Sequence, residues 1–260
     1  MARSPRAEDA LRELAALDLT HRVEIEAPAG LDDGAAAAAF ARGRQFDCVA
    51  VAAPVFSSAA IGRREPGASL SAEDPGLLAQ ARAETATAVR TAAAFRAPLV
   101  TVSAGTLVGS DAPGGARRRE QAVERLCREL SAVIRAEPGL RLALRVEAAA
   151  SALLDAEAAG WILEELPARS VGLALDVAAA RIREERGDEP CERWDQVAAG
   201  RLSCLYLSDC VGLEGGMPLG TGSVNPAWIA RLRGRGLPAI LKVSGGALRL
   251  ILRESIGRLL

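Results

Sequence analysis

The side chains best suited to chemistry in this chain stand near the ends of short apolar runs. Lys242, in the run 239–243, is the only lysine, and Tyr206, in the run 204–209, is the only tyrosine. Carboxylates can remove a proton from a substrate, and a tyrosine or lysine can supply one. We predict that the catalytic residues are Glu147, Asp176, Tyr206 and Lys242. We predict that the substrate-binding residues are Glu24, Glu26, Arg145 and Asp209.

More than one of these residues could fill each chemical role. Glu147 or Glu24 is the candidate general base, and Tyr206 or Lys242 is the candidate acid and electrophile. Lys242 is also a candidate for Schiff-base chemistry, since a desolvated lysine at a strand end can be a nucleophile. Neighbouring carboxylates would oppose that role, because they hold a lysine protonated and unreactive.

Seven apolar runs predict β-strands, and helical patterns fill the gaps between them. The strands are predicted at 22–27, 46–53, 98–104, 140–147, 171–177, 202–209 and 238–244. Strict alternation of strand and helix implies a parallel sheet with right-handed crossovers, either a barrel or an open doubly wound sheet. No G-x-G-x-x-G follows the first run, which weighs against a dinucleotide-binding domain. We therefore predict an α/β fold, a TIM-type (β/α) barrel of parallel strands in which the sequence reveals seven of the usual eight.

Residues 1–260 are predicted to form one domain, with an N-terminal helix within residues 1–20, because no linker, repeat or change in composition divides the chain. A helix over 117–137 should end at Pro138 and Gly139. The segment 247–260 is predicted to be a closing amphipathic helix. The predicted helix starts are Ser71 with Asp74, Ser151, and Asn225 before Pro226.

The alternation of strand side chains predicts which residues point into the barrel. In the run 142–147 the leucines and Val146 should face the outer helices, so that Arg145 and Glu147 face inward. The same rule predicts a ring of inward ionisable groups at the strand ends, made of Glu24, Glu26, Arg145, Glu147, Asp176, Tyr206 and Lys242. Buried charges must be paired or neutralised, so the ring is either a salt-bridge network that plugs the barrel or a pocket for a small polar ligand.

Composition and charge narrow the classes of partner. The net charge is −1 and the pI is near 6.0, which argues against binding to nucleic acid. No apolar stretch has the length of a membrane helix, and the N-terminus does not resemble a signal peptide. The 5 cysteines form no C-x-x-C pair, so we predict reduced thiols and a cytoplasmic protein. We expect a small carbohydrate-like ligand, no nucleic acid and no membrane, and the oligomeric state stays open.

The strand ends carry a family resemblance. Residues 142–147 are similar to an "LALE" strand, 171–176 to "VGLxLD", 205–209 to "VHLKD", and 219–225 to a "GxGxVD" loop that leads into a helix. In this order and spacing, over about residues 20–260, the motifs resemble the xylose isomerase-like TIM barrels. That family includes sugar isomerases, sugar epimerases and endonuclease IV.

The resemblance implies a degenerate metal site. Active members of the family hold a divalent metal with Glu, Asp, His and Glu from four strand ends. The residues of this sequence that fall at those positions are Arg145, Asp176, Tyr206 and Lys242, so the Asp is kept. Glu147, two residues after Arg145 and on the same face, could substitute for the first Glu. A further histidine of the family, three residues after the Asp, is replaced by Ala179. We therefore expect no metal cofactor, with Lys242 taking the place of the metal and neutralising Glu147 and Asp176.

The function implied is that of a sugar isomerase or epimerase-like barrel for a small hydroxylated or phosphorylated ligand, without the divalent metal. The alternative is a catalytically inactive relative that serves as a small-molecule or protein-binding module. Endonuclease chemistry is the least favoured, because its histidine-rich metal site cannot be assembled around the single histidine, His21.

Overall fold

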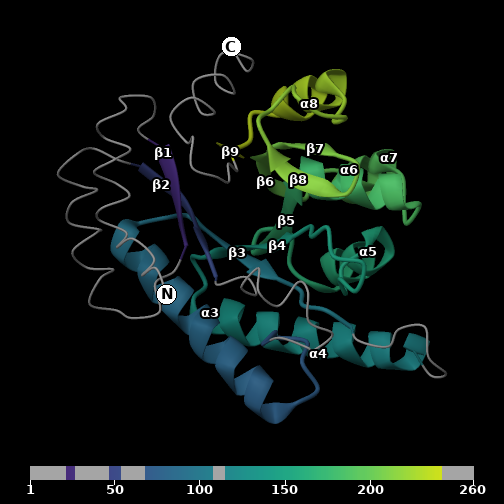
Figure 1. Ribbon diagram of the computed structural model, residues 1–260. Helices are drawn as coiled ribbons and strands as arrows, with labels where there is room; N and C mark the ends of the chain where they lie inside the picture. The colour runs from purple at the N-terminus through teal and green to yellow at the C-terminus, as the bar shows by residue number, and fades with distance from the viewer. Residues whose placement is uncertain (1–21, 27–46, 54–67, 108–114, 242–260) are drawn as a thin grey trace, which may run out of the picture.

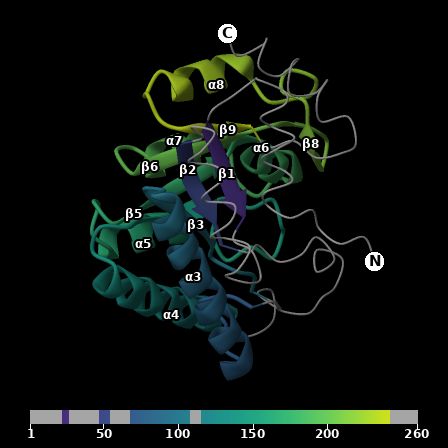
Figure 2. The same ribbon diagram turned by 90° about the vertical axis from the view of Figure 1, so that its left-hand side faces the viewer.

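The computed structural model describes residues 22–26, 47–53, 68–107 and 115–241. Seven strands form one parallel sheet in the order β1, β2, β3, β4, β5, β6, β9. Figures 1 and 2 show the sheet curling, with helices on its outer side. The strand bounds are β1 Arg22–Glu26, β2 Asp47–Ala52, β3 Leu99–Ser103, β4 Arg141–Arg145, β5 Val171–Asp176, β6 Leu202–Leu207 and β9 Ala239–Leu241. All seven predicted runs are confirmed as strands, and the fold is an α/β barrel of parallel strands.

Helices connect these strands. They are α3 Pro75–Phe95, α4 Gly115–Ala136, α5 Ala156–Glu165, α6 Val177–Arg186, α7 Cys191–Val197 and α8 Pro226–Arg233. None of the helices described is both long and apolar enough to cross a membrane. The predicted terminal helices, within 1–20 and over 247–260, lie outside the described residues.

Side-chain caps set where several helices begin. Asp74 accepts a hydrogen bond from the Leu77 amide at 2.8 Å, and Asn225 accepts one from the Ala227 amide at 2.9 Å, as predicted for these two residues. Ser71, predicted to act with Asp74, does not cap the helix, and its hydroxyl instead donates to the Ala104 carbonyl oxygen at 2.7 Å. The predicted start at Ser151 is wrong, because Asp155 caps α5 by accepting from the Ala158 amide. Residues 148–155 instead form a loop, whose Ala152 pairs with Thr106.

A short antiparallel hairpin follows the sixth strand and was not predicted. Its strands are β7 Asp209–Val211 and β8 Glu214–Met217. Gly212 turns the chain with a positive φ of 56°, a conformation that glycine adopts without a steric penalty. Strand periodicity could not reveal this hairpin, because its strands are short and Val211 and Leu213 are exposed to solvent.

Two hydrophobic clusters lie on opposite faces of the sheet and confirm the predicted alternation. The outer cluster contains Leu142, Leu144, Leu173, Leu175 and Leu205, packed with residues of the helices. The inner cluster is small, and it consists of Ala50, Leu99, Ala143, Ala174, Cys204 and Tyr206, with Ile240 against it. Because most inner side chains are small, the barrel interior has room for the polar groups described below.

A substitution at Gly172 provides a test of this inner packing. A Cβ atom at this position in β5 would collide with the Arg201 carbonyl oxygen and the Ser203 hydroxyl. We expect Gly172→Ala to lower the free energy of unfolding by about 1–3 kcal/mol, the usual cost of overpacking. The matched control is Gly160→Ala in α5, where a Cβ meets no atom within 4 Å. That change should raise stability by roughly 0.5–1 kcal/mol through helix propensity. Urea unfolding of both variants measures the difference, and equal effects would contradict the described packing.

Candidate functional site

Glu147 lies just beyond β4, at the carboxyl end of the sheet. The Ser103 hydroxyl, at the end of β3, donates a hydrogen bond to Glu147 Oε2 at 2.9 Å. The Gly105 amide donates to Ser103 Oγ at 3.0 Å, which leaves the hydroxyl proton to point at the carboxylate. Glu147 is partly buried, and its Oε1 atom is fully buried, so the hydrogen bond from Ser103 holds the carboxylate in one orientation. This geometry suits a general base.

Tyr206 and Arg145 are stacked inside the barrel. Tyr206 is 1% exposed, and its hydroxyl lies 2.8 Å from Thr101 Oγ1 of β3. The Arg145 Cζ atom lies 5.3 Å from the centre of the Tyr206 ring, within the range of a cation–π contact. Thr101 therefore anchors the ring, and the ring supports the guanidinium group.

Asp176 closes β5 and starts α6. Its side chain is buried, and Oδ1 accepts a hydrogen bond from the Ala179 amide at 3.0 Å. Where the resemblance implies a histidine, Ala179 thus contributes a backbone N–H that caps the helix. One carboxylate oxygen is accordingly engaged in holding the first turn of α6 against the strand end.

Asp209 organises the loop after the hairpin. Its Oδ1 accepts from the amides of Cys210 and Val224, and its Oδ2 accepts from the amide of Gly220, each at 2.9 Å. The side chain is fully buried. A substrate-binding role for Asp209 stays a prediction, and the hydrogen bonds assign it a structural task that sequence reasoning missed.

Three of the predicted site residues have side chains that lie outside the description. Glu24 and Glu26 fall in β1, where their backbones pair with Ala50 and Ala52 of β2. Lys242 directly follows β9 and is outside the described residues. The roles predicted for Glu24, Glu26 and Lys242, Schiff-base chemistry included, therefore stay predictions.

The mouth of the barrel is the carboxyl end of the sheet, where Glu147 lies. A buried ion pair near this mouth holds the loop that follows Glu147. Arg183 Nε lies 2.7 Å from Glu189 Oε1, and both side chains are 5% exposed. Arg183 Nη1 reaches the Glu147 carbonyl oxygen at 3.4 Å, and Glu189 Oε2 accepts from the Ala156 amide at 2.9 Å. Strand alternation could have found Ser103 and Thr101, which share the inner face of β3. No sequence signal marks Arg183 and Glu189.

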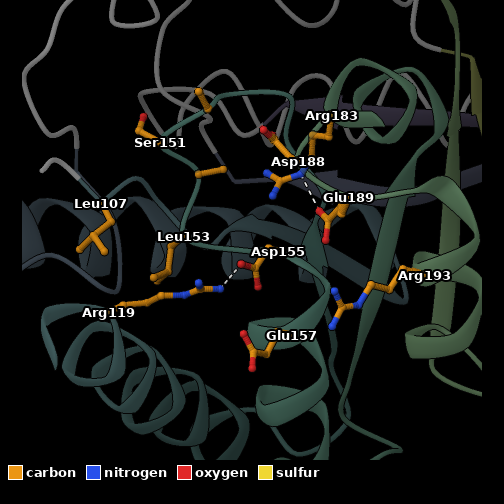
Figure 3. A pocket seen from close by; sticks show the side chains of 12 residues that line it. Leu107, Arg119, Ser151, Leu153, Asp155, Glu157, Arg183, Asp188, Glu189 and Arg193 are labelled. Carbon is orange, nitrogen blue, oxygen red and sulfur yellow. Dashed lines mark hydrogen bonds and ion pairs between the residues drawn. The ribbon is translucent and has the colours of Figure 1, made fainter. Parts of the chain in front are cut away.

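A polar cavity of about 250 Å³ lies beside this ion pair. Figure 3 shows the side chains that line it. Arg183, Asp188 and Glu189 form one side of the cavity, and Arg119 with Asp155 forms another. The loop 150–155 lies between these groups. Arg119 is ion-paired to Asp155, and Arg183 to Glu189, so these charges balance one another within the protein.

The cysteines are poor candidates for nucleophiles. Burial raises the pKa of the Cys127 thiol to about 11, with a smaller contribution from Glu165. Burial also raises the pKa values of Cys191 and Cys210 above the ordinary thiol range. At neutral pH these three groups therefore stay protonated, whereas the reactive form of cysteine is the thiolate. All five cysteines are free of disulfides.

Among the described residues, the side chains at the carboxyl end of the barrel do not assemble a site for a divalent metal. Across the described ranges, no group of three or more His, Cys, Asp and Glu side chains gathers in a way that could hold one. A cationic guanidinium, Arg145, occupies the inner face between Ala143 and Glu147, and Asp176 caps a helix. Divalent ions such as Mg²⁺ and Mn²⁺ require several oxygen or imidazole donors, which these residues do not supply.

The chain belongs to the xylose isomerase-like TIM barrel family, whose model matches residues 13–249. A xylose isomerase domain protein from Planctomyces limnophilus is 17% identical, with a TM-score of 0.69, covering 95% of this chain and 89% of its own. A 3-keto-D-glucoside 4-epimerase from E. coli is 12% identical, with a TM-score of 0.74 and coverages of 99% and 95%. Endonuclease IV from Thermus thermophilus is 18% identical, with a TM-score of 0.68 and coverages of 97% and 94%. No curated protein matches the sequence. At these identities the solved structures show the fold alone.

Asp209 provides a test of the loop at the mouth. We expect Asp209→Asn to lower the free energy of unfolding by about 1–3 kcal/mol, because the amide nitrogen must face a backbone N–H donor in a buried site. Asp74→Asn is the matched control, since asparagine caps a helix as well as aspartate does. Denaturant unfolding of the two variants measures the difference. If both were neutral, the three backbone hydrogen bonds of Asp209 would not be the source of loop stability.

Proposed function

We propose that this chain is an enzyme of the sugar isomerase or epimerase type that works on a small hydroxylated or phosphorylated ligand without a divalent metal. The observation that carries the proposal is the Glu147 carboxylate, oriented by Ser103 at 2.9 Å at the carboxyl end of a parallel barrel. Active sites of such barrels lie at this end. Membership of a family that contains epimerases adds support.

The proposed reaction moves one proton. Glu147 takes the proton from a carbon next to the substrate carbonyl group, and the electron pair left behind forms an enediolate. Tyr206 or Lys242 donates a proton to the developing oxyanion, which gives an enediol. In epimerisation that same oxygen gives its proton back, and Glu147 returns its own proton to the first carbon from the other face of a turned intermediate. In isomerisation the hydroxyl group on the first carbon loses its proton and becomes the new carbonyl group, while Glu147 protonates the neighbouring carbon, so that neither reaction needs an oxidant or reductant.

The charges around the mouth suit an enediolate. Arg145 lies two residues before Glu147 on the same strand face and is buried, and a buried cation stabilises a developing negative charge more strongly than an exposed one. In this proposal the guanidinium takes over the electrostatic task that a metal performs in other members of the family. The unpaired cysteines support a cytoplasmic location for the enzyme.

The test is deuterium exchange at the carbon next to the carbonyl group, followed by proton NMR. Wild-type protein, treated with a chelator, is incubated in D₂O with neutral ketohexoses and their phosphates. We expect exchange into at least one of them, and we expect Glu147→Gln to slow it by roughly 10²–10⁴-fold, as for the loss of a general base. Glu120→Gln, an exposed carboxylate on α4, is the control and should leave the rate unchanged.

Two results would contradict the proposal in different ways. Exchange that appears only after addition of Mn²⁺, Mg²⁺, Co²⁺ or Zn²⁺ would overturn the metal-free mechanism and keep the isomerase class. Absence of exchange with every sugar, with or without metal, would overturn the enzyme and leave a binding module.

A further inference from the structure

We infer that Arg145 is an anion-binding residue, and that one edge of its guanidinium receives the carboxylate or phosphate group of the ligand. The inference rests on the proposed function and narrows its substrate class to short hydroxylated molecules with a two-oxygen anionic end. The argument depends on the burial of Arg145, on which of its atoms lack partners, and on what surrounds it.

Arg145 is buried, and two of its nitrogen atoms lack a hydrogen-bond partner in the described part of the chain. Its exposure is 9%, and the buried atoms Nε and Nη2 have no hydrogen-bond partner among the residues that the structure describes. Arg183, the other arginine that is buried in the described ranges, is instead paired with Glu189 at 2.7 Å. A buried guanidinium without a counter-charge is costly, which points to a counter-charge that arrives with the ligand.

The unpaired atoms form one geometric unit. Nε–H and Nη2–H lie side by side on one edge of the planar guanidinium and point in the same direction, which matches two oxygens of a carboxylate or phosphate. The chain itself shows this mode of binding on its surface. Arg82 uses Nε and Nη2 to bind the two oxygens of Glu129 at 2.7 and 2.6 Å. Arg145 presents the same edge without an occupant from the described part of the protein.

The neighbouring carboxylates do not fill this edge. Glu147 Oε2 accepts from Ser103, and Asp176 Oδ1 accepts from the Ala179 amide. No ion pair joins Arg145 to either of them or to any other described carboxylate. The Tyr206 ring covers one face of the guanidinium, and Thr101 fixes that ring. The edge is therefore pre-oriented, which limits the entropy lost when an anion binds.

The strand spacing sets the length of the ligand. Arg145 ends β4, and the Val146 amide continues the pairing by donating to the Ala174 carbonyl oxygen at 3.0 Å. In extended chain, residues two apart are separated by roughly 6.6 Å, at about 3.3 Å per residue. An anionic group on Arg145 would thus place a carbon a few bonds away beside the Glu147 carboxylate. Uronic acids, keto acids of sugars and sugar phosphates have this combination of an anionic end and a reactive carbonyl carbon, whereas neutral sugars lack the anion.

The test measures dissociation constants by titration calorimetry at constant ionic strength. The probes are D-gluconate, inorganic phosphate and the neutral sugar D-fructose, with sodium chloride as the ionic control. We expect saturable binding of gluconate or phosphate to the wild type, and the stronger of the two identifies the source of the anion. Arg145→Gln should weaken that binding at least tenfold, and Arg145→Lys should restore it only in part, because lysine keeps the charge without the two-point edge. Arg82→Gln is the control, because the guanidinium edge of Arg82 is already occupied by Glu129. This variant should bind the anions as tightly as the wild type.

Thermal unfolding shows whether a variant is folded before its binding is interpreted. Without ligand, Arg145→Gln should melt at or above the wild-type temperature, because the substitution removes an uncompensated buried charge. A wild type that binds neither anion, or an Arg145→Gln variant that binds them as tightly as the wild type, would overturn the inference.

The failure of this inference and the failure of the proposed function are separable. One result would reject the anion site and keep the isomerase proposal. In that result neither anion binds, and deuterium exchange into neutral ketoses is equal in the wild type and in Arg145→Gln. Anion binding that depends on Arg145, with no exchange into any sugar or sugar phosphate, would keep the anion site and reject the isomerase proposal.

Discussion

The contrast between the two faces of the parallel sheet underlies the rest of this structure. The outer face carries leucines that pack against helices, and the inner face carries alanines, a cysteine and Tyr206. Small inner residues keep the strands close and leave volume at the carboxyl ends, where loops can place polar groups. A buried sheet can tolerate such groups only if hydrogen bonds or charges satisfy them. Thr101 with Tyr206 and Ser103 with Glu147 meet this requirement directly.

In the proposed function, charge distinguishes this site from the metal centres that the resemblance implies for active members of the family. A divalent ion gathers carboxylates around itself, and those carboxylates need its charge to stay ionised together. Here a guanidinium stands on the inner face, and one surviving acid, Asp176, caps a helix. The positive charge is therefore built into the chain at Arg145 and supported by an aromatic ring. Such a charge has a fixed position and a directional edge, so it selects a ligand by geometry more than a hydrated ion does.

Loops around the mouth are stabilised by buried acids that face backbone amides. Asp209 binds three N–H groups, and Glu189 binds the first amide of α5 while it is paired with Arg183. These contacts join segments that are far apart in sequence, such as residues 209 and 224. A loop held in this way keeps a fixed shape as a ligand enters, which favours precise placement of Glu147.

Local periodicity in the sequence determined the strands, their order along the chain and the inward face of β4, β5 and β6, because alternation is a property of neighbouring residues. It also led to Arg145, Glu147, Asp176 and Tyr206 as inward groups.

Only the tertiary structure decided what each group contacts. The pairing of Ser103 with Glu147, the stacking of Arg145 on Tyr206, and the role of Asp209 in its loop depend on register between strands and on loop paths. The start of α5 at Asp155, and not at Ser151, was decided in the same way, since the loop before it pairs with Thr106 across the mouth. Such contacts join residues distant in sequence, and no local pattern encodes them.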